Sequence, residues 1–264
     1  MSAGPDPESL ASVTVPYRVR FDECGPDGLV RTSAWLRYAQ DVAWIHSERL
    51  GFDRRWYLER GLAWVVRAAE VVVLRPVATG ETVAVTTRVT GFRKVWARRR
   101  TEARLEDGTL ATWGHTDWVM TDARGTPVRV PAVFPGRFVV PPGTFEPGRV
   151  PLPRTPPDAA EIRSVVRHRD LDPMAHVNNA TYLDYLEEAV LAAGEAGERV
   201  VAAIPRDVRI EYLAPAAPAA PLLGSAWREQ GEAAAGAAWA WRLTDDRETE
   251  LARGVLTDRA EEVA

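Results

Sequence analysis

The sequence repeats one segment at two places. Residues 20–41 can be laid over residues 167–188 with a constant offset of 147 positions, the difference between Val177 and Val30. The positions that recur are mostly apolar or aromatic: Pro26 on Pro173, Trp35 on Tyr182, Leu36 on Leu183, Tyr38 on Tyr185. An internal repeat restricts the chain to two copies of one structural unit.

The ionisable positions differ between the two copies. Gly25 stands where the second copy has Asp172, and Leu29 stands where it has His176. Duplication followed by division of labour would leave one copy as scaffold and the other with the chemistry. The alternative is that polar loop residues of one copy drifted without a function.

Composition excludes several classes of protein. The chain has 264 residues, 46% of them hydrophobic, and ten tryptophans, enough for a sizeable core. A net charge of −4 gives no global reason to expect nucleic acid or a membrane surface as partner. The single cysteine, Cys24, excludes an internal disulfide and fits a reducing compartment, so we expect a cytoplasmic protein. The N-terminal residues lack the basic start and apolar run of a signal peptide, and no apolar segment approaches the length of a membrane span.

Each copy has the pattern of a strand, a long helix and four antiparallel strands. The first copy predicts a strand over 13–21, a helix over 33–50, and strands over 63–73, 81–91, 95–105 and 109–121. Thr79-Gly80, a short basic turn and Asp107-Gly108 separate these strands as hairpin-like turns. The second copy predicts a strand over 161–169, a helix over 179–193, and strands over 207–213, 222–230, 234–244 and 248–257.

Ten prolines lie between the copies, in residues 123–160. This density predicts an extended linker without regular structure. We therefore expect a disordered tail over 1–12, an N-terminal domain over 13–122, the linker over 123–160, and a C-terminal domain over 161–258. A long helix wrapped by a curved antiparallel sheet is a hotdog fold. The sequence thus predicts an α+β double hotdog whose two sheets join into one, which covers exposed strand edges.

Asp172 and His176 are the strongest candidates for chemistry. They lie four residues apart in the loop that enters the second helix, so both side chains can face one crevice. An ionised Asp can act as nucleophile or base, and a neutral imidazole can activate or orient water. The N–H groups of Val177, Asn178 and Asn179, at the positive end of the helix, could stabilise an oxyanion. The alternative is structural: a turn aspartate, an interior histidine, and Asn178 or more readily Asn179 as the helix N-cap.

These residues resemble a known family. The segment from Asp170 to Tyr182, followed by Ile210-Glu211-Tyr212, is similar to the second hotdog of plant and bacterial acyl-acyl-carrier-protein thioesterases, with their D-L-D-x-N-x-H-V-N-N and L-E-Y motifs. The first half resembles the family at residues 62–67 and 98–100, and the likeness covers about residues 14–258. The resemblance implies that Asp172 and His176 are catalytic.

The chain departs from that family at two positions. The Asn of the motif is Met174 here, and the catalytic Glu beyond L-E-Y falls on Pro215. Asp172-Pro173 also resembles the D-P of 4-hydroxybenzoyl-CoA thioesterases, in which the equivalent Asp acts without an Asn and Glu pair. Glu187 or Glu188 on the helix could supply a replacement carboxylate, although at least one of them should face solvent.

A local basic cluster interrupts the acidic chain. Its members are Arg93, Lys94, Arg98, Arg99 and Arg100, with Phe92 and Trp96 between them. Such a cluster can bind nucleic acid, dock an acidic carrier protein or CoA, or form an ordinary solvated face. His46, His115 and His168 show no metal-ligand spacing, and no glycine cluster cradles a phosphate, so we expect no metal and no cofactor.

The sequence therefore predicts a hydrolase that releases a carboxylic acid from an acyl thioester in fatty-acid or related acyl metabolism. The substrate would be carried by acyl carrier protein or CoA, with no nucleic acid or membrane as partner, and the chain would be a monomer or homodimer. The second half would hold the active site, while the first half would shape the acyl pocket. The candidate pocket residues, each also a candidate core residue, are Trp35, Tyr38, Ala39 and Trp64. Two alternatives remain: an enoyl-thioester hydratase or dehydratase, and a binding protein without turnover.

Overall fold

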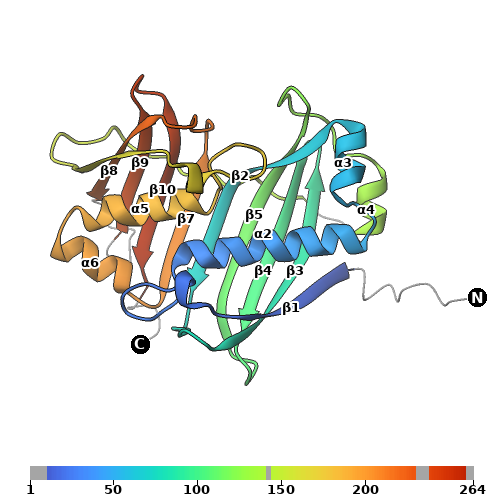
Figure 1. Ribbon diagram of the computed structural model, residues 1–264, viewed down its shortest axis with the longest axis horizontal. Coiled ribbons are helices and arrows are strands. Elements are labelled where there is room, and N and C mark those ends of the chain that lie inside the picture. The colour runs from blue at the N-terminus through green and yellow to red at the C-terminus, as the bar shows by residue number, and fades with distance from the viewer. Residues whose placement is uncertain (1–10, 141–143, 230–237, 260–264) are drawn as a thin grey trace, which may run out of the picture. The chain divides into compact units, whose positions relative to one another are not determined.

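The computed structural model describes residues 11–140, 144–229 and 238–259. The chain packs as two compact units (Figure 1). The first unit comprises Met1–Val30, Arg37–Ala69 and Val77–Gly148, and the second comprises Arg31–Leu36, Glu70–Pro76 and Arg149–Ala264. Within the described ranges, no helix is both long and apolar enough to span a membrane.

The predicted helix and strands of the first copy are present, with ends shifted by a few residues. The elements are β1 (Ser12–Arg18), the short 3-10 helix η1 (Phe21–Glu23), α2 (Thr32–Arg49), α3 (Arg54–Arg60), β2 (Leu62–Val73), β3 (Thr82–Arg93), β4 (Trp96–Arg104), β5 (Leu110–Asp122) and α4 (Val133–Arg137). Helix α3 was not predicted. Asp53 caps its N-terminus and Gly61, with φ +59°, ends it after seven residues.

The second copy repeats this plan. Its elements are β6 (Ala160–Val165), η2 (His168–Asp170), α5 (Thr181–Leu191), α6 (Glu195–Ala202), β7 (Arg206–Tyr212), β8 (Pro221–Arg228), β9 (Ala238–Asp245) and β10 (Glu250–Asp258). Helix α5 begins two residues later than predicted, and α6 was not predicted. Of the expected tail, residues 1–10 lie outside the description, as do residues 234–237 of the expected strand over 234–244, whereas Ser12 already belongs to β1.

The two copies share one topology. The strand order is β1-β3-β4-β5-β2 in the first copy and β6-β8-β9-β10-β7 in the second. The first strand of each copy, β1 or β6, therefore lies at the same end of its order. The pairings β1–β3, β3–β4, β4–β5, β6–β8, β8–β9, β9–β10 and β10–β7 are antiparallel. The repeat seen in the sequence is therefore a repeat of the whole strand–helix–sheet unit.

Of the three turn predictions, two were confirmed and one was wrong. The short basic turn at Lys94 joins β3 and β4 as an antiparallel hairpin. Asp107-Gly108 closes the β4–β5 hairpin, with Gly108 at φ +85° and the Leu105 N–H donating to the Thr109 carbonyl at 2.9 Å. Thr79-Gly80 does not close a hairpin, because β2 and β3 are not neighbours. Its backbone bonds instead to the loop before α2, where the Thr79 N–H donates to the Gly28 carbonyl at 3.0 Å.

The Pro-rich segment contains regular structure, contrary to the prediction. Helix α4 lies inside it and places Phe134 and Phe138 in the core of the first unit, where they stack on Phe52 with ring centroids 4.3 and 5.6 Å away. Burying each phenylalanine is worth about 1.5–3 kcal/mol. Packing of these two rings in the core therefore stabilises a helix within the Pro-rich segment.

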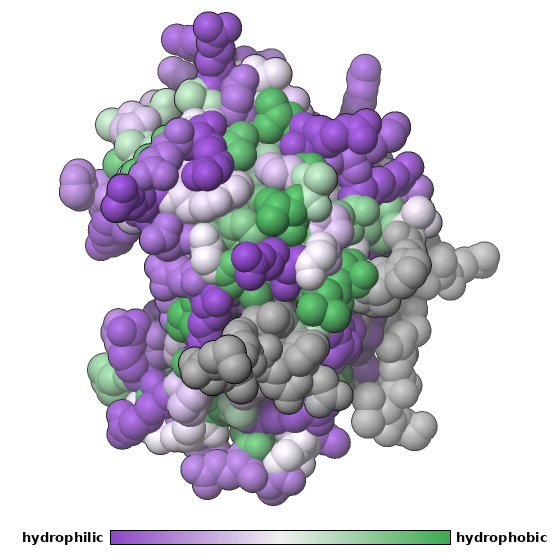
Figure 2. Space-filling model, turned by 90° about the vertical axis from the view of Figure 1, so that its right-hand side faces the viewer, coloured by the Kyte–Doolittle hydropathy of each residue, from purple (hydrophilic) through white to green (hydrophobic). Residues whose placement is uncertain are grey.

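Some apolar side chains at this end of the first unit remain at the surface. Leu58 on α3, Val133 on α4 and Val139 after it are 67%, 46% and 45% exposed. Figure 2 shows apolar residues on this face of the molecule among strongly polar ones.

The sheet of the first unit has two different faces. Alternation along β4 points Arg99 towards α2, which lies across that face (Figure 1), and points Arg98 the other way. Arg98 forms a bidentate pair with Asp117 on β5, both contacts 2.7 Å, and Asp117 also accepts the Gly148 N–H at 2.7 Å. The outer face thus binds the Pro-rich segment at Gly148, inside that segment.

Candidate active site

Asp172 and His176 sit opposite each other in a tight turn between η2 and α5. Leu171 and Val177 form an antiparallel bridge at its base. The Asp172 N–H donates to the His176 carbonyl at 2.8 Å, and the Ala175 N–H donates to the Asp172 carbonyl at 2.9 Å. Ala175 takes φ +59°, the left-handed conformation that reverses the chain.

The first copy builds the same turn from other side chains. Cys24 and Val30 form the equivalent bridge, and the Gly25 N–H donates to the Leu29 carbonyl at 2.8 Å. The Gly28 N–H donates to the Gly25 carbonyl at 3.0 Å, and Gly28 takes φ +76°. The offset of 147 positions thus relates the backbone hydrogen bonds of the two turns as well as their amino-acid sequences.

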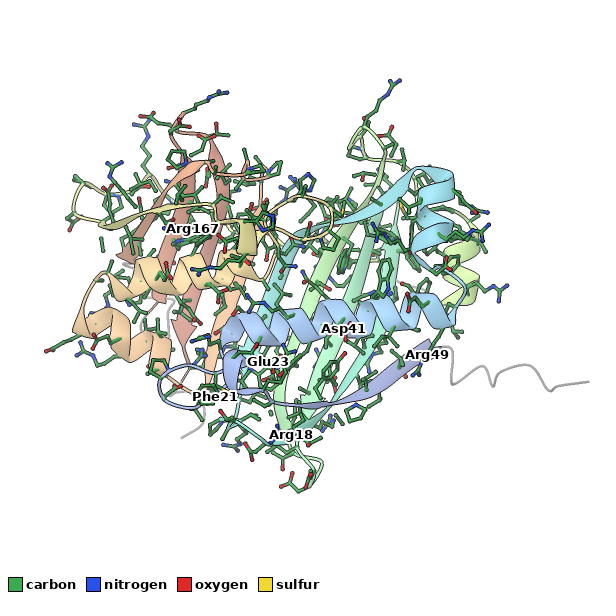
Figure 3. All side chains as sticks on the ribbon, in the orientation of Figure 1. Arg18, Phe21, Glu23, Asp41, Arg49 and Arg167 are labelled. Carbon is green, nitrogen blue, oxygen red and sulfur yellow. The ribbon has the colours of Figure 1, made fainter. Side chains whose placement is uncertain are left out.

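A tyrosine anchors each turn to its own helix. Tyr38 donates its hydroxyl proton to Glu23 at 2.5 Å, and Tyr185 donates to Asp170 at 2.8 Å. Glu23 lies at the foot of α2 in Figure 3. The same carboxylates accept the N–H groups of Arg20 and Arg167, the residues that open the two loops. Burial, and then the bonded carboxylate, raises the pKa of both tyrosines.

The side chains at the tip of the second turn are placed differently from each other. Asp172 is partly buried, and its Oδ1 accepts the N–H groups of Met174 at 2.8 Å and His176 at 3.4 Å. His176 is exposed, and its imidazole makes no hydrogen bond within the described residues. The turn brings the two residues together through the backbone, and it leaves Asp172 Oδ2 and the imidazole available to a ligand or water.

The end of the turn departs from the expected cap and oxyanion donors. Neither asparagine caps the helix as predicted: the N-cap of α5 is Ala180, which makes no side-chain cap bond, and Asn178 Oδ1 accepts the Ala180 N–H at 2.9 Å in the turn before the helix. The Asn178 N–H donates to the Asp170 carbonyl at 2.8 Å and is not available to an oxyanion. The N–H groups of Val177 and Asn179 make no such bond within the described ranges, so they remain as candidate donors.

Tyr182 is a candidate that sequence reasoning left in the core. Its hydroxyl oxygen accepts the Ala216 N–H at 3.0 Å. Burial raises the pKa of Tyr182, and the nearby charge of Asp172 raises it further. The hydroxyl therefore contacts the backbone that follows Pro215 and is close enough to Asp172 to be influenced by its charge. The sequence repeat could have pointed to this hydroxyl, since the first copy has Trp35, which has no hydroxyl, at the equivalent position.

The two departures from the family motif have no local substitute of the same chemistry. Met174 is 48% exposed and offers Asp172 only its backbone N–H. Pro215 is exposed and has no side-chain donor or acceptor. The Tyr182 hydroxyl, which accepts the N–H of Ala216, is a polar side-chain group next to the position where the family has its Glu.

Neither helix glutamate is placed at the turn by a hydrogen bond. Glu187 accepts the Thr32 hydroxyl at 2.5 Å, and Arg206 donates to the same hydroxyl at 3.0 Å. Burial raises the pKa of Glu187 despite the opposing effects of Arg206 and Thr32. Glu188 is exposed, as expected for one of the pair, and burial followed by the charges of Asp184 and Asp170 raises its pKa.

Glu211 of the L-E-Y-like segment is a structural carboxylate. It is 2% exposed and accepts hydrogen bonds from Arg149 at 2.7 Å, the Val150 N–H at 3.1 Å and Arg253 at 2.9 Å. Burial acts to raise its pKa, but these donors outweigh burial, and the pKa lies below its usual value. Beside it, Tyr212 donates to the Asn179 carbonyl at 2.9 Å and so joins β7 to the start of α5.

The basic cluster does not form one docking surface. Arg99 is 7% exposed, because the alternation of β4 turns it into the interior. Arg98 is occupied by Asp117, and Arg100 pairs with Glu102 at 2.7 Å. Arg93 pairs with Glu146 at 2.7 Å. Lys94 forms the β3–β4 turn at φ +54°.

The candidate pocket residues are mostly core. Trp35, Tyr38 and Ala39 are 5%, 5% and 8% exposed, and Trp64 is half-buried, donating to the Tyr57 hydroxyl at 3.1 Å. Cys24 is buried and free, as expected for a packing residue. Among the described residues, no group of three His, Cys, Asp or Glu side chains could hold a metal ion.

Comparison with known proteins assigns the family. Residues 12–132 match the N-terminal domain of acyl-ACP thioesterases, and residues 156–220 match their C-terminal domain. The chain is 27% identical, over 192 residues, to a chloroplastic acyl-[acyl-carrier-protein] hydrolase of Cuphea viscosissima, a match that covers 66% of this chain and 46% of the plant protein. The chain thus spans about half the length of the curated relatives it matches.

Solved structures show the same fold. A putative oleoyl thioesterase from Lactobacillus plantarum superposes with a TM-score of 0.81 at 19% identity, covering 93% of this chain and 94% of that one. The 12:0-ACP thioesterase from Umbellularia californica gives a TM-score of 0.76 at 20% identity, with 94% and 93% covered. These likenesses confirm the α+β double-hotdog prediction. With both family domains matched in order, the chain belongs to the acyl-ACP thioesterase family.

Proposed function

We propose that this protein hydrolyses an acyl thioester to a free carboxylic acid and a thiol, with its active site at the Asp172 turn. The observation that carries the proposal is the pair of matching turns, of which only the second holds an ionisable pair, in a chain that matches both domains of a thioesterase family. The curated relatives act on acyl groups carried by acyl carrier protein, as their names state. Acyl-ACP is therefore the proposed substrate, with acyl-CoA as the second carrier to test.

In this proposal Asp172 acts as base or nucleophile through Oδ2, while Oδ1 stays fixed by the turn. With Asp172 as base, water adds to the thioester carbonyl, the C–S bond breaks, and the proton taken from water leaves with the thiol. His176 orients or deprotonates the water, and the N–H groups of Val177 and Asn179 face the developing oxyanion. Tyr182 has an electrostatic role beside this base, because its hydroxyl is close enough to be influenced by the charge of Asp172.

We further propose a cytoplasmic role in fatty-acid or related acyl metabolism, as a monomer or homodimer. The single cysteine supports a reducing compartment. The reaction as written uses no metal and no cofactor beyond the carrier's own phosphopantetheine or CoA.

The test is a panel of short, medium, long and aromatic acyl thioesters on carrier protein and on CoA, followed by thiol release and by hydration of enoyl thioesters. Thiol release from at least one member supports hydrolysis, and the panel then names the acyl group and carrier. Water addition to an enoyl thioester without thiol release would identify a hydratase. Saturable binding without either reaction would identify a binding protein and would contradict the proposal.

A further inference from the structure

The interior of the first unit contains a buried cation without a carboxylate partner. Arg99 is 7% exposed and donates to His46 Nδ1 at 3.1 Å and to Ser47 Oγ at 3.2 Å. Its guanidinium carbon lies 5.2 Å from the centre of the Phe138 ring. No described carboxylate forms an ion pair with it. Burial lowers the pKa of Arg99 to about 10, which leaves the side chain charged at neutral pH.

Two other buried charges of the chain have a charged partner. Asp117, 2% exposed, has the bidentate Arg98 as partner, and Glu211, 2% exposed, has Arg149 and Arg253. A buried charge without an opposite charge costs several kcal/mol, whereas a paired one recovers most of that cost. Arg99 differs from these two carboxylates, because its partners are the neutral groups of His46, Ser47 and Phe138.

The same inner face of the sheet is lined with hydroxyl groups. The register places four threonines on the face of Arg99: Thr87, Thr101, Thr112 and Thr116. Thr112 is 5% exposed, and its hydroxyl has no hydrogen-bond partner within the described residues. Thr101 stays only partly buried although it lies in the middle of β4. A buried hydroxyl without a hydrogen-bond partner thus lies on the same face as Arg99, whose charge has no carboxylate partner among the described residues.

We propose that this interior, lined by Arg99 and, four residues further along the same face of the sheet, by Thr112, binds an oxygen-bearing group of the acyl chain, a carboxylate or hydroxyl remote from the thioester. An oxygen acceptor would offset the buried charge, whereas a plain alkyl chain would leave its cost in place. This inference rests on the proposed thioester hydrolysis. It narrows the substrate class to oxygenated acyl groups.

The test uses matched acyl thioesters of equal length that end in a carboxylate, a hydroxyl or a methyl group, at several lengths. We expect kcat/KM for an oxygenated member to exceed that of the methyl-ended member by about tenfold or more at some length, equal to about 1.4 kcal/mol. Preference for the methyl-ended member at every length would overturn the inference while leaving hydrolysis intact.

If no thioester is hydrolysed, the proposed function fails and the inference is judged by binding instead. Calorimetry with the free acids then compares α,ω-dicarboxylic, ω-hydroxy and unsubstituted acids of equal length. Tighter binding of the oxygenated acids supports the site, and equal or weaker binding overturns it.

Two variants locate the preference. Arg99→Met removes the charge at similar length and should reduce the ratio of oxygenated to methyl-ended turnover by about tenfold, mainly through KM. Arg104→Met, on the same strand but exposed, serves as control and should leave the ratio unchanged. If Arg99→Met does not fold, Thr112→Val keeps the side-chain shape and should lower the ratio several-fold. The proposal would be contradicted if the ratio of oxygenated to methyl-ended turnover were unchanged in both Arg99→Met and Thr112→Val. If only Thr112→Val folds, an unchanged ratio in that variant would contradict it.

Discussion

The first loop, residues 20–30, and the second, residues 167–177, share one backbone conformation but carry different side chains at the turn. Both close with the same bridge, the same pair of backbone hydrogen bonds and a left-handed residue before the last strand position. Gly25 and Leu29 form the backbone hydrogen bond of the first turn, just as Asp172 and His176 form that of the second. The turn therefore does not require an ionisable pair, and its presence in one copy needs an explanation outside folding.

Each loop nevertheless uses one aspartate for its own structure. In the first, Asp27 Oδ1 accepts the Leu29 N–H at 3.0 Å, and in the second, Asp172 Oδ1 accepts two N–H groups. The difference is position: Asp27 lies past the proline, whereas Asp172 lies directly across the turn from His176. A carboxylate at the tip is structural in both copies, and only the second also has an imidazole opposite.

The largest effect should come from giving the second loop the residues of the first. The double variant Asp172→Gly with His176→Leu removes both candidate groups, so thioester hydrolysis should fall by about 10²–10⁴-fold, the scale of lost acid–base catalysis. The double variant also loses the two hydrogen bonds of Asp172 Oδ1, so adding Met174→Asp, the counterpart of Asp27 in the first loop, should keep the melting temperature close to that of wild type. Retained hydrolysis in a folded double variant would place the chemistry elsewhere.

A smaller loss should follow from Tyr182→Phe. The variant removes the hydroxyl whose pKa the charge of Asp172 raises, and we expect kcat to fall about tenfold. It also leaves the buried Ala216 N–H without its acceptor, which costs about 1–3 kcal/mol of stability. Tyr212→Phe, which loses the bond to the Asn179 carbonyl, is the matched control. Equal kinetic losses in both variants would show that Tyr182 acts only through packing.

The two anchors allow a symmetrical test of stability. Tyr38→Phe and Tyr185→Phe each remove a hydrogen bond to a carboxylate, so each should cost about 1.5–3 kcal/mol, measured by denaturant unfolding. Only Tyr185→Phe should also reduce hydrolysis. Because the folded-state pKa of both tyrosines is raised, their contribution is present below about pH 10 and is lost at higher pH. Wild-type stability that does not decline more steeply there than that of the variants would contradict this assignment.

The smallest effect concerns Glu187, whose counterpart in the first copy is Gln40. Since burial raises its folded-state pKa, the native state holds a proton that the unfolded chain has lost, and its contribution is present below about pH 4.3 and declines as pH rises. Glu187→Gln should flatten this decline, by about 1.4 kcal/mol per unit of pKa difference. Unfolding curves at pH 4 and pH 7 measure it. An identical slope in wild type and variant would show that Glu187 does not titrate in this range.

The sequence predicted the repeated unit because its signals are local. Helix α2 keeps an apolar stripe, the strands alternate, and Asp107-Gly108 has the residues that a hairpin turn needs. Helices α3 and α4 were missed because each is short and is stabilised by tertiary packing of rings such as Phe134. Their existence depends on contacts that no local pattern contains.

The candidate site was predicted in part for the same reason. Asp172 and His176 stand out by type and spacing within one loop. Tyr182 became a candidate only when the fold brought Ala216 to its hydroxyl across 34 positions of sequence. Arg99 was assigned to a surface because its neighbours in sequence are basic, whereas the pleat of β4 separates Arg98 from Arg99 by turning them to opposite faces.

The most direct test of one active turn in two is the pair Asp172→Asn and Asp27→Asn, assayed for thiol release on the best substrate of the panel. Both variants keep an amide oxygen that can accept the turn's N–H groups, so both should fold. We predict that Asp172→Asn loses about a hundredfold or more of wild-type activity and that Asp27→Asn retains it. Equal activity in the two variants, whether both high or both low, would contradict the account.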